Sequence, residues 1–578
     1  MSESILIQDA DTGLWWSFPP PRETLAATRL AEVLPLLRQA EARVDAENLW
    51  AVGFIAYEAG PAFDPAIRAR PPGPLPLARF TLHDAPRLIP LPSPGDSAAP
   101  RYRWSPSVDR REYDAAIARI RAGIAGGETY QVNYTLRLRA ALEEPPWDLF
   151  LRAVGANSPR HGAYLDCGRF VICSASPEQF FRLEGEELTS RPMKGTASRG
   201  PSPARDEERA RALAASPKDR AENVMIVDMA RNDLGRVCAV GSVQVPELFT
   251  LERYPTVWQM TSTVTGRTTA SVSGILRALF PPASTTGAPK GQATRLIAEL
   301  ETAPRGVYTG CIGCIAPGRR ARFSVAIRTA CFDLEARALE YGVGGGIVWD
   351  STSEAEYDEC LLKARIVTDA QPEFALLETL LWEPGAGYFL LEEHLARLAQ
   401  AARFFGISAD LGAVRSRLAR LAAGFGPRAE RVRLTVDRGG AIDCASEALA
   451  APSAPVRLGI AADPIATGSP FLYHKTTHRA AYDDARASRP GCDDVVLWNE
   501  RGEVTETTIA NLVVEWDGER VTPPVECGLL PGVFRAWLLA TGQVRERRIT
   551  RDELRAVKRV WVVNSVRRWR DAVVADAD

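Results

Sequence analysis

A lone lysine, Lys194, stands at the centre of the stretch TSRPMKGTASRG, residues 189–200. The residues around it are small, rigid or basic: Arg191, Pro192, Gly195, Thr196 and Arg199. An amine that attacks a substrate carbon must be held in position and must have a lowered pKa, whereas a surface lysine needs neither. The setting favours a nucleophilic lysine, and an ordinary loop lysine is the alternative that this stretch leaves open.

Two pairs of carboxylates occur at a spacing of three residues. Asp219 and Glu222 lie in SPKDRAENVMIVDM, and Glu356 and Glu359 lie in SEAEYDEC. Both segments have a helical pattern, so the members of each pair share a helix face. Like charges repel, and oxygen ligands of this kind suit a partly hydrated Mg²⁺ ion. A solvated acidic helix face is the alternative explanation, so spacing alone leaves the metal site a hypothesis.

A glycine-rich run, YGVGGGIVWD, contains Gly342 and then Gly344, Gly345 and Gly346. No helix is predicted after it, which argues against a dinucleotide-binding loop. Consecutive glycines can instead direct backbone N–H groups at an anion. A plain tight turn is the other interpretation, and the sequence alone favours it.

The composition is that of a soluble globular protein with large cores. The 578 residues are 46% hydrophobic and 25% charged, with a formal net charge of −2, and the length predicts two to four domains. The charge gives no reason to expect nucleic acid or a membrane as partner. We expect no signal peptide and no membrane helix, because the start has no basic region before an apolar run and no apolar stretch approaches ~20 residues.

Ten cysteines are scattered along the chain. Cys311 and Cys314 form a CxxC, but in TGCIGCIAPG they read as a strand in which residues three apart face opposite ways. Core positions are the favoured interpretation, and zinc or redox use is disfavoured. We expect a cytoplasmic location, where thiols stay reduced.

The elements that must position these residues fall into two parts. The pattern predicts a helix within 23–43, a strand within 50–60 and a Pro-rich surface excursion over 70–106. A capped helix, a Gly-Gly turn and a strand follow from Ser107. The predicted division is 1–106 for an N-terminal part with its excursion, 107–369 for a catalytic domain, 370–374 for a linker and 375–578 for a second domain.

Six motifs in the first part resemble those of the chorismate-utilising enzymes and occur in the same order. They are SASPEQFF, RPMKGT, AENVMIVDMARNDLGRV, TTGAPKGQA, VAIRTA and YGVGGGIVWDSTSEAEYDECLLKAR, spanning about residues 107–369. Within that family, the lysine of RPMKGT resembles the aminodeoxychorismate synthases, since anthranilate and isochorismate synthases usually have a small or apolar residue there. An anthranilate-type synthase is the alternative that Lys194 disfavours.

The resemblance implies roles for individual residues. Glu222 and Glu359 would ligate Mg²⁺, with Asp219 and Glu356 behind them, and the ion would hold the ring carboxylate of chorismate. The rest of the substrate would be bound by Thr286, Lys290, Tyr308, Arg328, Gly344, Gly345, Gly346 and Lys363. Glu178 of SPE is the expected acid/base, because the C4 hydroxyl leaves poorly without a proton. Lys194 would add at C2 as the C4 hydroxyl departs, and ammonia would then enter at C4.

No stretch of the sequence resembles a glutamine amidotransferase, with its cysteine elbow and distant histidine. We therefore expect a separate glutaminase subunit as the source of ammonia. The N-terminal region around GLWWSF and GFIAYEAG is short for the family, so an effector pocket there is doubtful.

The second part resembles the fold-type IV pyridoxal-phosphate enzymes, through EEHLARL, RVRLTVDRGG, FLYHKTTHRAAYDDA, VTETTIANLVV, CGLLPGVFRAWLL and WVVNSVRRWR. The resemblance implies that Lys475 forms the Schiff base with the cofactor and later moves a proton, and that Glu506 pairs with the pyridinium nitrogen. The phosphate would be held by Arg397, the backbone of Val533 and Phe534 at a helix start, and Asn564 with Ser565. Phe534 stands where many relatives have a hydroxyl residue.

The expected fold class is α+β: a chorismate-binding β-sandwich with outer helices, followed by a branched-chain-aminotransferase-like domain. Because the first half would make aminodeoxychorismate, the simplest interpretation of the second half is a lyase that converts this product to pyruvate and 4-aminobenzoate. An aminotransferase, an inactive domain and a scaffold remain alternatives.

Overall fold

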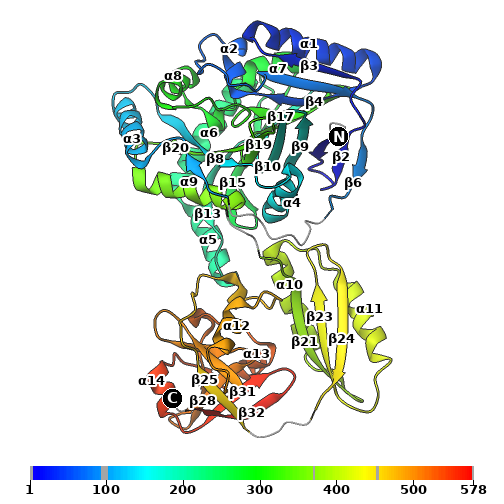
Figure 1. Ribbon diagram of the computed structural model, residues 1–578, viewed down its shortest axis with the longest axis vertical. Coiled ribbons are helices and arrows are strands. Elements are labelled where there is room, and N and C mark those ends of the chain that lie inside the picture. The colour runs from blue at the N-terminus through cyan, green and yellow to red at the C-terminus, as the bar shows by residue number, and fades with distance from the viewer. Residues whose placement is uncertain (1–3, 93–101, 369–371, 451–454, 576–578) are drawn as a thin grey trace. The chain divides into compact units, whose positions relative to one another are not determined.

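The computed structural model describes residues 4–92, 102–368, 372–450 and 455–575. The chain forms two compact units: unit 1 is Met1–Ser198 with Ala210–Gln371, and unit 2 is Arg199–Arg209 with Pro372–Asp578 (Figure 1). The predicted linker overlaps residues outside the described ranges at positions 370 and 371. None of the helices in those ranges has an apolar stretch that could span a lipid bilayer.

Unit 1 contains two ten-stranded antiparallel sheets. The first, sheet A, has the order β16 (Gly287–Ala288), β8 (Gln131–Ala141), β20 (Ala338–Ile347), β19 (Thr329–Asp333), β10 (Phe170–Ser176), β9 (His161–Cys167), β1 (Ile5–Gln8), β2 (Trp15–Ser17) and β6 (Arg87–Ile89), with β7 (Ser105–Pro106) on β8. The second, sheet B, has the order β13 (Met193–Ser198), β15 (Val257–Arg267), β12 (Glu187–Arg191), β11 (Gln179–Glu184), β18 (Arg320–Val325), β17 (Cys311–Ala316), β4 (Trp50–Ile55), β5 (Ala78–His83) and β3 (Glu23–Ala27), with β14 (Gln244–Arg253) on β15.

The two sheets pack face to face, because one apolar cluster joins Ile5 and Ile172 of sheet A to Phe54 and Ile312 of sheet B. The outer face of sheet B is covered by α1 (Leu30–Glu47), α2 (Gly60–Phe63), α6 (Pro217–Gly235) and α7 (Val272–Leu279). The outer face of sheet A is covered by α3 (Arg110–Ala125), α4 (Pro146–Asn157), α8 (Lys290–Leu300) and α9 (Ser353–Thr368). The predicted sandwich with outer helices is confirmed.

Two local predictions in the N-terminal segment are wrong. Residues Glu23–Ala27 form a strand rather than the start of the helix, which begins only at Leu30. The Pro-rich stretch is not only a surface excursion, since β5 pairs with β3 and β4 and buries Phe80 and Leu82 in the core. Alternation of apolar residues in ARFTLH was the signal for this strand.

Unit 2 contains two sheets. The first has the order β22 (Gly387–Tyr388), β21 (Leu376–Glu383), β23 (Glu430–Val436) and β24 (Ile442–Ala448), and packs against α10 (Leu391–Phe405) and α11 (Leu411–Ala422). The second has the order β27 (Val504–Thr507), β26 (Asp494–Trp498), β25 (Val456–Ile460), β32 (Arg568–Val574), β31 (Val560–Asn564), β28 (Asn511–Trp516), β29 (Glu519–Thr522) and β30 (Arg545–Glu546). Its helices are α12 (Ala480–Ala487), α13 (Val533–Ala540) and α14 (Arg551–Ala556).

Unit 2 also includes Arg199–Arg209, where α5 (Pro203–Ala215) begins, although the sequence placed this segment in the first part. The Arg199 guanidinium lies 4.4 Å from the centre of the Phe404 ring and is paired with Asp206. The ring of Phe404 in turn lies 4.1 Å from that of His474. A short motif cannot reveal such a long-range contact.

Candidate functional site

A cavity of about 320 Å³ lies in unit 1 and brings together most of the residues singled out from the sequence. Strands β8, β13 and β20 and helices α6 and α9 contribute to its wall. The predicted residues that line it are Glu178, Lys194, Asp219, Glu222, Tyr308, Arg328, Gly344, Gly346, Glu356, Glu359 and Lys363. Its size is in the range of pockets that bind small molecules.

Lys194 extends from β13 into this cavity with 18% of its side chain exposed. Its ammonium group lies 3.2 Å from the Glu222 carboxylate. The next residue, Gly195, has φ +101°, a conformation that other residues rarely adopt, and a Cβ there would crowd Asp219. The backbone therefore requires glycine beside the lysine, and the expectation of a rigid frame agrees with this geometry.

The glycine run lies within β20 rather than in the tight turn that the sequence alone favoured. A Cβ on Gly342 would lie 2.3 Å from the Tyr308 ring, and one on Gly346 would lie 2.6 Å from Lys194 Nζ. The absence of side chains at these glycines thus allows Tyr308 and Lys194 to approach the strand closely. Gly345 is not among the cavity-lining residues, and a Cβ there would lie 2.7 Å from the Glu356 carboxylate.

The four predicted metal-binding carboxylates lie on α6 and α9 and line the same cavity. Glu222 is paired with Lys194, and Glu359 is paired with Lys363 at 2.7 Å. Burial raises the pKa of Glu356. Burial also acts to raise the pKa of Glu359, but Lys363 together with the charges of Lys194 and Lys218 holds that pKa below its usual value.

No group of three or more His, Cys, Asp and Glu side chains in the described ranges has a metal-binding arrangement. Mg²⁺ commonly takes only one or two protein carboxylates and keeps several waters. Carboxylates from two helices that face one cavity therefore fit this ion, although each of the two predicted ligands is paired with a lysine here.

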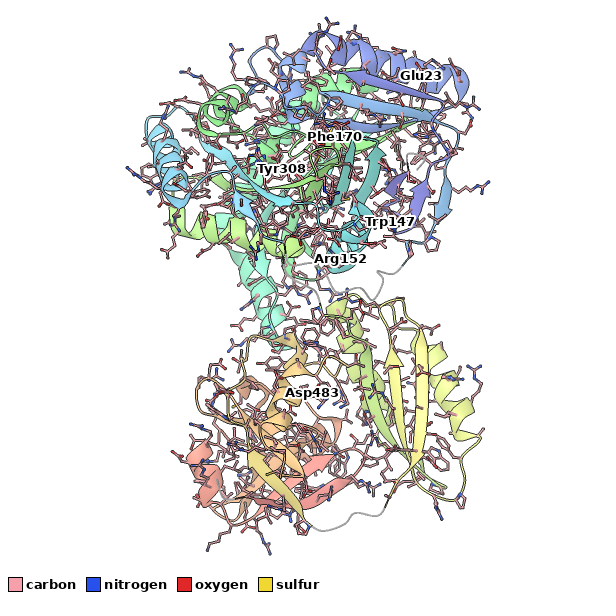
Figure 2. The ribbon with its side chains drawn as sticks, viewed as in Figure 1. Glu23, Trp147, Arg152, Phe170, Tyr308 and Asp483 are labelled. Carbon is pink, nitrogen blue, oxygen red and sulfur yellow. The ribbon has the colours of Figure 1, made fainter. Side chains whose placement is uncertain are left out.

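Cationic and polar groups also line the cavity. Lys363 donates to the Gly344 carbonyl at 2.8 Å, and Arg328 has φ +49°. Burial lowers the pKa of Arg328. Tyr308 is 8% exposed and lies among the interior side chains of unit 1 (Figure 2). These groups can bind a carboxylate.

Glu178 is 4% exposed at the cavity wall. Burial raises its pKa to about 7, against smaller opposing effects of hydrogen bonds with Ser284 and the Met193 backbone. A carboxyl group that is half protonated near neutral pH can donate and take back a proton.

Besides Gly345, two other predicted substrate-binding residues do not line the cavity. The Thr286 hydroxyl is fully buried and donates to the carbonyls of Pro282 and Ala283. Lys290 donates to Asp233 at 2.6 Å and to the Leu279 carbonyl. In this structure the polar atoms of both side chains are engaged with neighbouring protein groups rather than directed into the cavity.

Sequence reasoning missed Asn133, Thr285 and Gln131. The first two line the cavity, and Asn133 donates to the Thr285 carbonyl at 3.1 Å. Gln131 is fully buried, both atoms of its amide have no hydrogen-bond partner, and its Nε2 lies 3.0 Å from the Cβ position of Gly346. The signal available was the motif YQVNYT, in which polar residues alternate along a strand.

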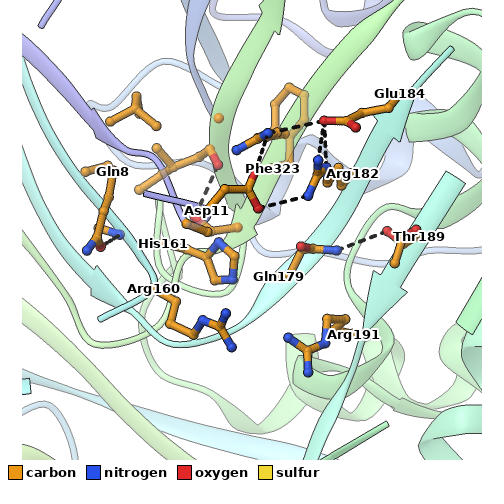
Figure 3. Close-up of a pocket in the computed structure, with 18 of the residues that line it drawn as sticks. Gln8, Asp11, Arg160, His161, Gln179, Arg182, Glu184, Thr189, Arg191 and Phe323 are labelled. Carbon is orange, nitrogen blue, oxygen red and sulfur yellow. Dashed lines mark hydrogen bonds and ion pairs between the residues drawn. The ribbon is translucent and has the colours of Figure 1, made fainter. Parts of the chain in front are cut away.

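A second cavity of about 290 Å³ lies in unit 1 and shares no lining residue with the first (Figure 3). Its wall includes the ion-paired residues Asp11, Arg182 and Arg322, and the half-buried His161. Burial and the nearby Arg160 and Arg191 lower the pKa of His161 to about 3, so its ring is neutral. Strand β1 contributes Ile7 and Gln8 to this cavity, whereas none of its lining residues comes from GLWWSF or GFIAYEAG, so the doubt about an effector pocket there stays untested.

In unit 2, Lys475 lies beside β21, where its carbonyl accepts from Leu377 N at 3.0 Å. Burial, reinforced by the charge of Arg397, lowers the pKa of Lys475 to about 8. Glu506 is 4% exposed, and burial raises its pKa to about 7. Its carboxylate accepts from Tyr482, Asn511 and the Leu530 backbone. These environments suit a reactive amine and an oriented carboxylate.

Arg397 is held rigidly near the start of α13. It forms two hydrogen bonds with Glu378, at 2.9 and 2.6 Å, and donates to the Pro531 carbonyl at 3.3 Å. The predicted helix start at Val533 is confirmed, and a Cβ on the preceding Gly532 would lie 1.9 Å from Asn511 Oδ1. A guanidinium beside a helix N-terminus suits a phosphate group.

The remaining predicted phosphate contacts have local roles in this structure. Phe534 is 3% exposed and its ring stacks on Trp537, so only its backbone is available. The Asn564 side-chain oxygen accepts from the backbone of Val566 and Arg567, and Ser565 is buried. Lys475, Glu506, Arg397 and the start of α13 fit pyridoxal phosphate. Arg397 and the helix start are the groups best suited to bind its phosphate.

Comparison with known proteins assigns each unit. Residues 5–369 match the family model described as chorismate binding enzyme, and residues 375–573 match the one described as amino-transferase class IV. Aminodeoxychorismate synthase component 1 of Salmonella typhimurium is 42% identical over 258 residues, 44% of this chain and 56% of that protein. Anthranilate synthase component 1 of Streptomyces coelicolor is 38% identical over 271 residues, 46% of this chain and 52% of that protein. The chain thus spans about half the length of these curated relatives.

The crystal structure of anthranilate synthase component I from Streptococcus pneumoniae is 23% identical, with a TM-score of 0.52, and the match covers 63% of this chain and 90% of that one. This likeness shows a common fold for unit 1. Since the first family model covers more than half of the sequence, the chain belongs to the chorismate binding enzyme family, and an amino-transferase class IV domain follows over residues 375–573.

Proposed function

We propose that unit 1 aminates chorismate at C4 to give 4-amino-4-deoxychorismate and that unit 2 releases pyruvate from this product to give 4-aminobenzoate, a folate precursor. The observation that supports this most is the position of Lys194, whose ammonium lies in a cavity that is also lined by carboxylates and by Arg328 and Lys363. The relatives named aminodeoxychorismate synthase support the same reaction.

In the proposed first reaction, the Lys194 ammonium first loses a proton to solvent, and the resulting amine forms a bond to C2 of chorismate while the C4–O bond breaks. Glu178 in its protonated form gives a proton to the departing hydroxyl, which leaves as water. Ammonia then forms a bond to C4, the C2–N bond to Lys194 breaks, and the amine is restored. The ring is not oxidised, and the net change replaces hydroxyl by amine.

The other wall residues bind the substrate in this proposal. Tyr308, Arg328 and the edge of β20 at Gly344 and Gly346 take up the carboxylate of the enolpyruvyl group. Glu222 and Glu359 would hold Mg²⁺, with Asp219 and Glu356 behind them, and the ion would supply positive charge to the ring carboxylate. Lys363 orients Glu359 through their ion pair.

For unit 2, pyridoxal phosphate would supply an electron sink when bound. Lys475, with a pKa of about 8, would move the proton, and Glu506 would orient the cofactor ring. The product of the first reaction is a primary amine, and loss of pyruvate makes its ring aromatic. The aminotransferase alternative has the same residues and differs in its product.

Ammonia has to come from another protein in this proposal. The Salmonella relative is named component 1, and the chain lacks residues resembling a glutaminase, so we infer a separate glutaminase partner. We place the enzyme in the cytoplasm, where the free thiols of the ten cysteines would remain reduced.

Product analysis tests both halves. Purified chain is incubated with chorismate, Mg²⁺ and ammonium, with and without pyridoxal phosphate, and the products are separated and identified by mass spectrometry. We expect aminodeoxychorismate without the cofactor and 4-aminobenzoate with it. Anthranilate as the product would contradict the proposal for unit 1, and a transaminated keto acid would contradict it for unit 2.

A further inference from the structure

Three charged side chains lie behind the wall of the candidate chorismate cavity without lining it. Glu301, Arg305 and Arg137, here called the ionic cluster, are 3%, 2% and 1% exposed. Glu301 and Arg305 follow α8 four residues apart, and Tyr308 comes three residues later in the same segment, ETAPRGVYTG. Arg137 comes from β8.

All five N–H groups of Arg305 have an acceptor. Two of them bind Glu301, at 3.0 and 2.6 Å. Two others bind the backbone carbonyls of Thr285, at 2.8 Å, and Asn133, at 2.6 Å, and the fifth contacts the Thr309 hydroxyl. Asn133 and Thr285 both line the cavity, so one guanidinium fixes two separate pieces of its wall.

Glu301 fixes a third piece. Its carboxylate accepts from the backbone N–H of Thr135 at 2.9 Å and from the Thr135 hydroxyl at 2.7 Å. The side chain of Thr135 lies against Gly344, where a Cβ would approach it within 2.5 Å. Arg137 donates to the same hydroxyl at 2.8 Å, and its guanidinium lies 5.3 Å from the Tyr308 ring.

Stability does not explain this arrangement well. Burying charges costs several kcal/mol of desolvation per ion, and apolar replacements of buried ion pairs are often as stable or more stable. What an apolar replacement could not supply is the set of hydrogen bonds that joins Asn133, Thr135 and Thr285, which come from different segments.

We infer that the ionic cluster positions the wall that binds the enolpyruvyl carboxylate, acting through Asn133, Thr285, Thr135 and Tyr308 and touching no substrate atom. This inference rests on the proposed function of unit 1, since it names the ligand of that wall. The three residues are positioning residues. A wall displaced by their loss is expected to bind chorismate more weakly, with a smaller effect on Lys194, which lies on the separate strand β13.

Three variants test the inference. Thr135→Val keeps the shape of the side chain and removes the hydroxyl that joins Glu301 to Arg137, so it is expected to fold. Glu301→Gln places an amide donor against groups that themselves donate. Glu144→Gln is the matched control, because Glu144 is 8% exposed, is paired with Arg152 and does not line the cavity.

Steady-state kinetics at saturating ammonium should show KM for chorismate raised about tenfold or more in Glu301→Gln, a loss of about 1.4 kcal/mol of binding. A smaller rise is expected in Thr135→Val, with kcat within about threefold in both variants. Glu144→Gln should lower the thermal midpoint without changing KM. Unchanged KM in folded Glu301→Gln and Thr135→Val would overturn the inference, since a purely structural role changes only the folded fraction.

If the wild-type chain neither binds nor converts chorismate, the proposed function fails, and the inference is tested by hydrogen exchange. Amides within residues 133–137 and 284–286 should exchange faster in Glu301→Gln than in Glu144→Gln. Equal exchange in the two variants would overturn the positioning role.

Discussion

Gly346 and Lys194 lie so close that a single methyl group on the glycine would stand 2.6 Å from the lysine nitrogen. Two segments, β13 and β20, thus meet at the position of the proposed nucleophile, and their approach depends on the absence of a side chain. This contact defines the centre of the candidate chorismate site.

Gly346→Ala should displace the Lys194 amine and lower ammonia-dependent turnover of chorismate about 10²-fold, because small misplacements of reacting groups have effects of this size. Turnover of aminodeoxychorismate by unit 2 should stay unchanged. Gly235→Ala, at the end of α6 with open space around it, is the control and should keep both activities. Full amination activity in Gly346→Ala would contradict the assigned geometry.

Gln131→Met should preserve or raise the thermal midpoint, because neither atom of the buried amide has a partner to lose. Chorismate turnover should nevertheless fall, since the side chains of Gln131 and Lys194 both approach the Cβ position of Gly346, and a change at position 131 alters the packing there. Differential scanning calorimetry and ammonia-dependent kinetics measure the two effects. A destabilised variant with unchanged kinetics would show that Gln131 is only a structural residue.

Glu178 should give a pH dependence to both activity and stability. Its pKa is raised to about 7, and a general acid must be protonated, so kcat/KM at constant free ammonia should be level below pH 7 and fall above it. Because the folded state binds the proton more tightly than the unfolded chain, this carboxyl stabilises the fold fully below its unfolded pKa of about 4.5, and the contribution is lost as pH rises through 7.

Glu178→Gln should remove that limb of the pH profile and lower turnover about 10² to 10⁴-fold. The effect on stability is measured as the free energy of unfolding in urea at several pH values, for the wild type and the variant. The assignment would be wrong if the variant kept the wild-type pH profile.

Lys475→Ala should abolish the visible absorbance expected of a lysine-bound pyridoxal phosphate and all formation of 4-aminobenzoate, while chorismate amination continues. Lys558→Ala changes an exposed lysine of the same unit and serves as the control. Absorbance spectra of the purified proteins with added cofactor check the first expectation, and product analysis checks the second. A cofactor band unchanged in Lys475→Ala would exclude this lysine as the attachment point.

Gly532→Ala should weaken cofactor binding, because the added methyl group would stand 1.9 Å from Asn511 Oδ1 and displace the start of α13. Asn511 also binds Glu506, so both ends of the cofactor would be disturbed. Fluorescence titration with pyridoxal phosphate should show a Kd raised about tenfold. An unchanged Kd would mean that the phosphate is held elsewhere.

The sequence predicted the fold class. It also singled out those residues of the first site whose placement depends on the periodicity of a single helix or strand. The carboxylate pairs on α6 and α9 and the helix start at Val533 depend on local periodicity, which a sequence displays. Local patterns say little where contacts between distant segments decide the partners of a side chain. Thr286 and Lys290 belong to a motif with the right order, but their polar atoms are taken by Pro282 and Asp233. Gln131 was missed because an unpartnered amide is visible only once its surroundings are known.

The central claim is that Lys194 bonds to the substrate during amination. Wild-type chain and Lys194→Ala, with Lys218→Ala as an exposed lysine of the same cavity, are compared for ammonia-dependent turnover, and the wild type incubated with chorismate alone is digested and examined by mass spectrometry. The account predicts an adduct on the peptide containing Lys194 and a loss on the order of 10³ or more in Lys194→Ala, with Lys218→Ala active. Wild-type-like turnover by Lys194→Ala would contradict it.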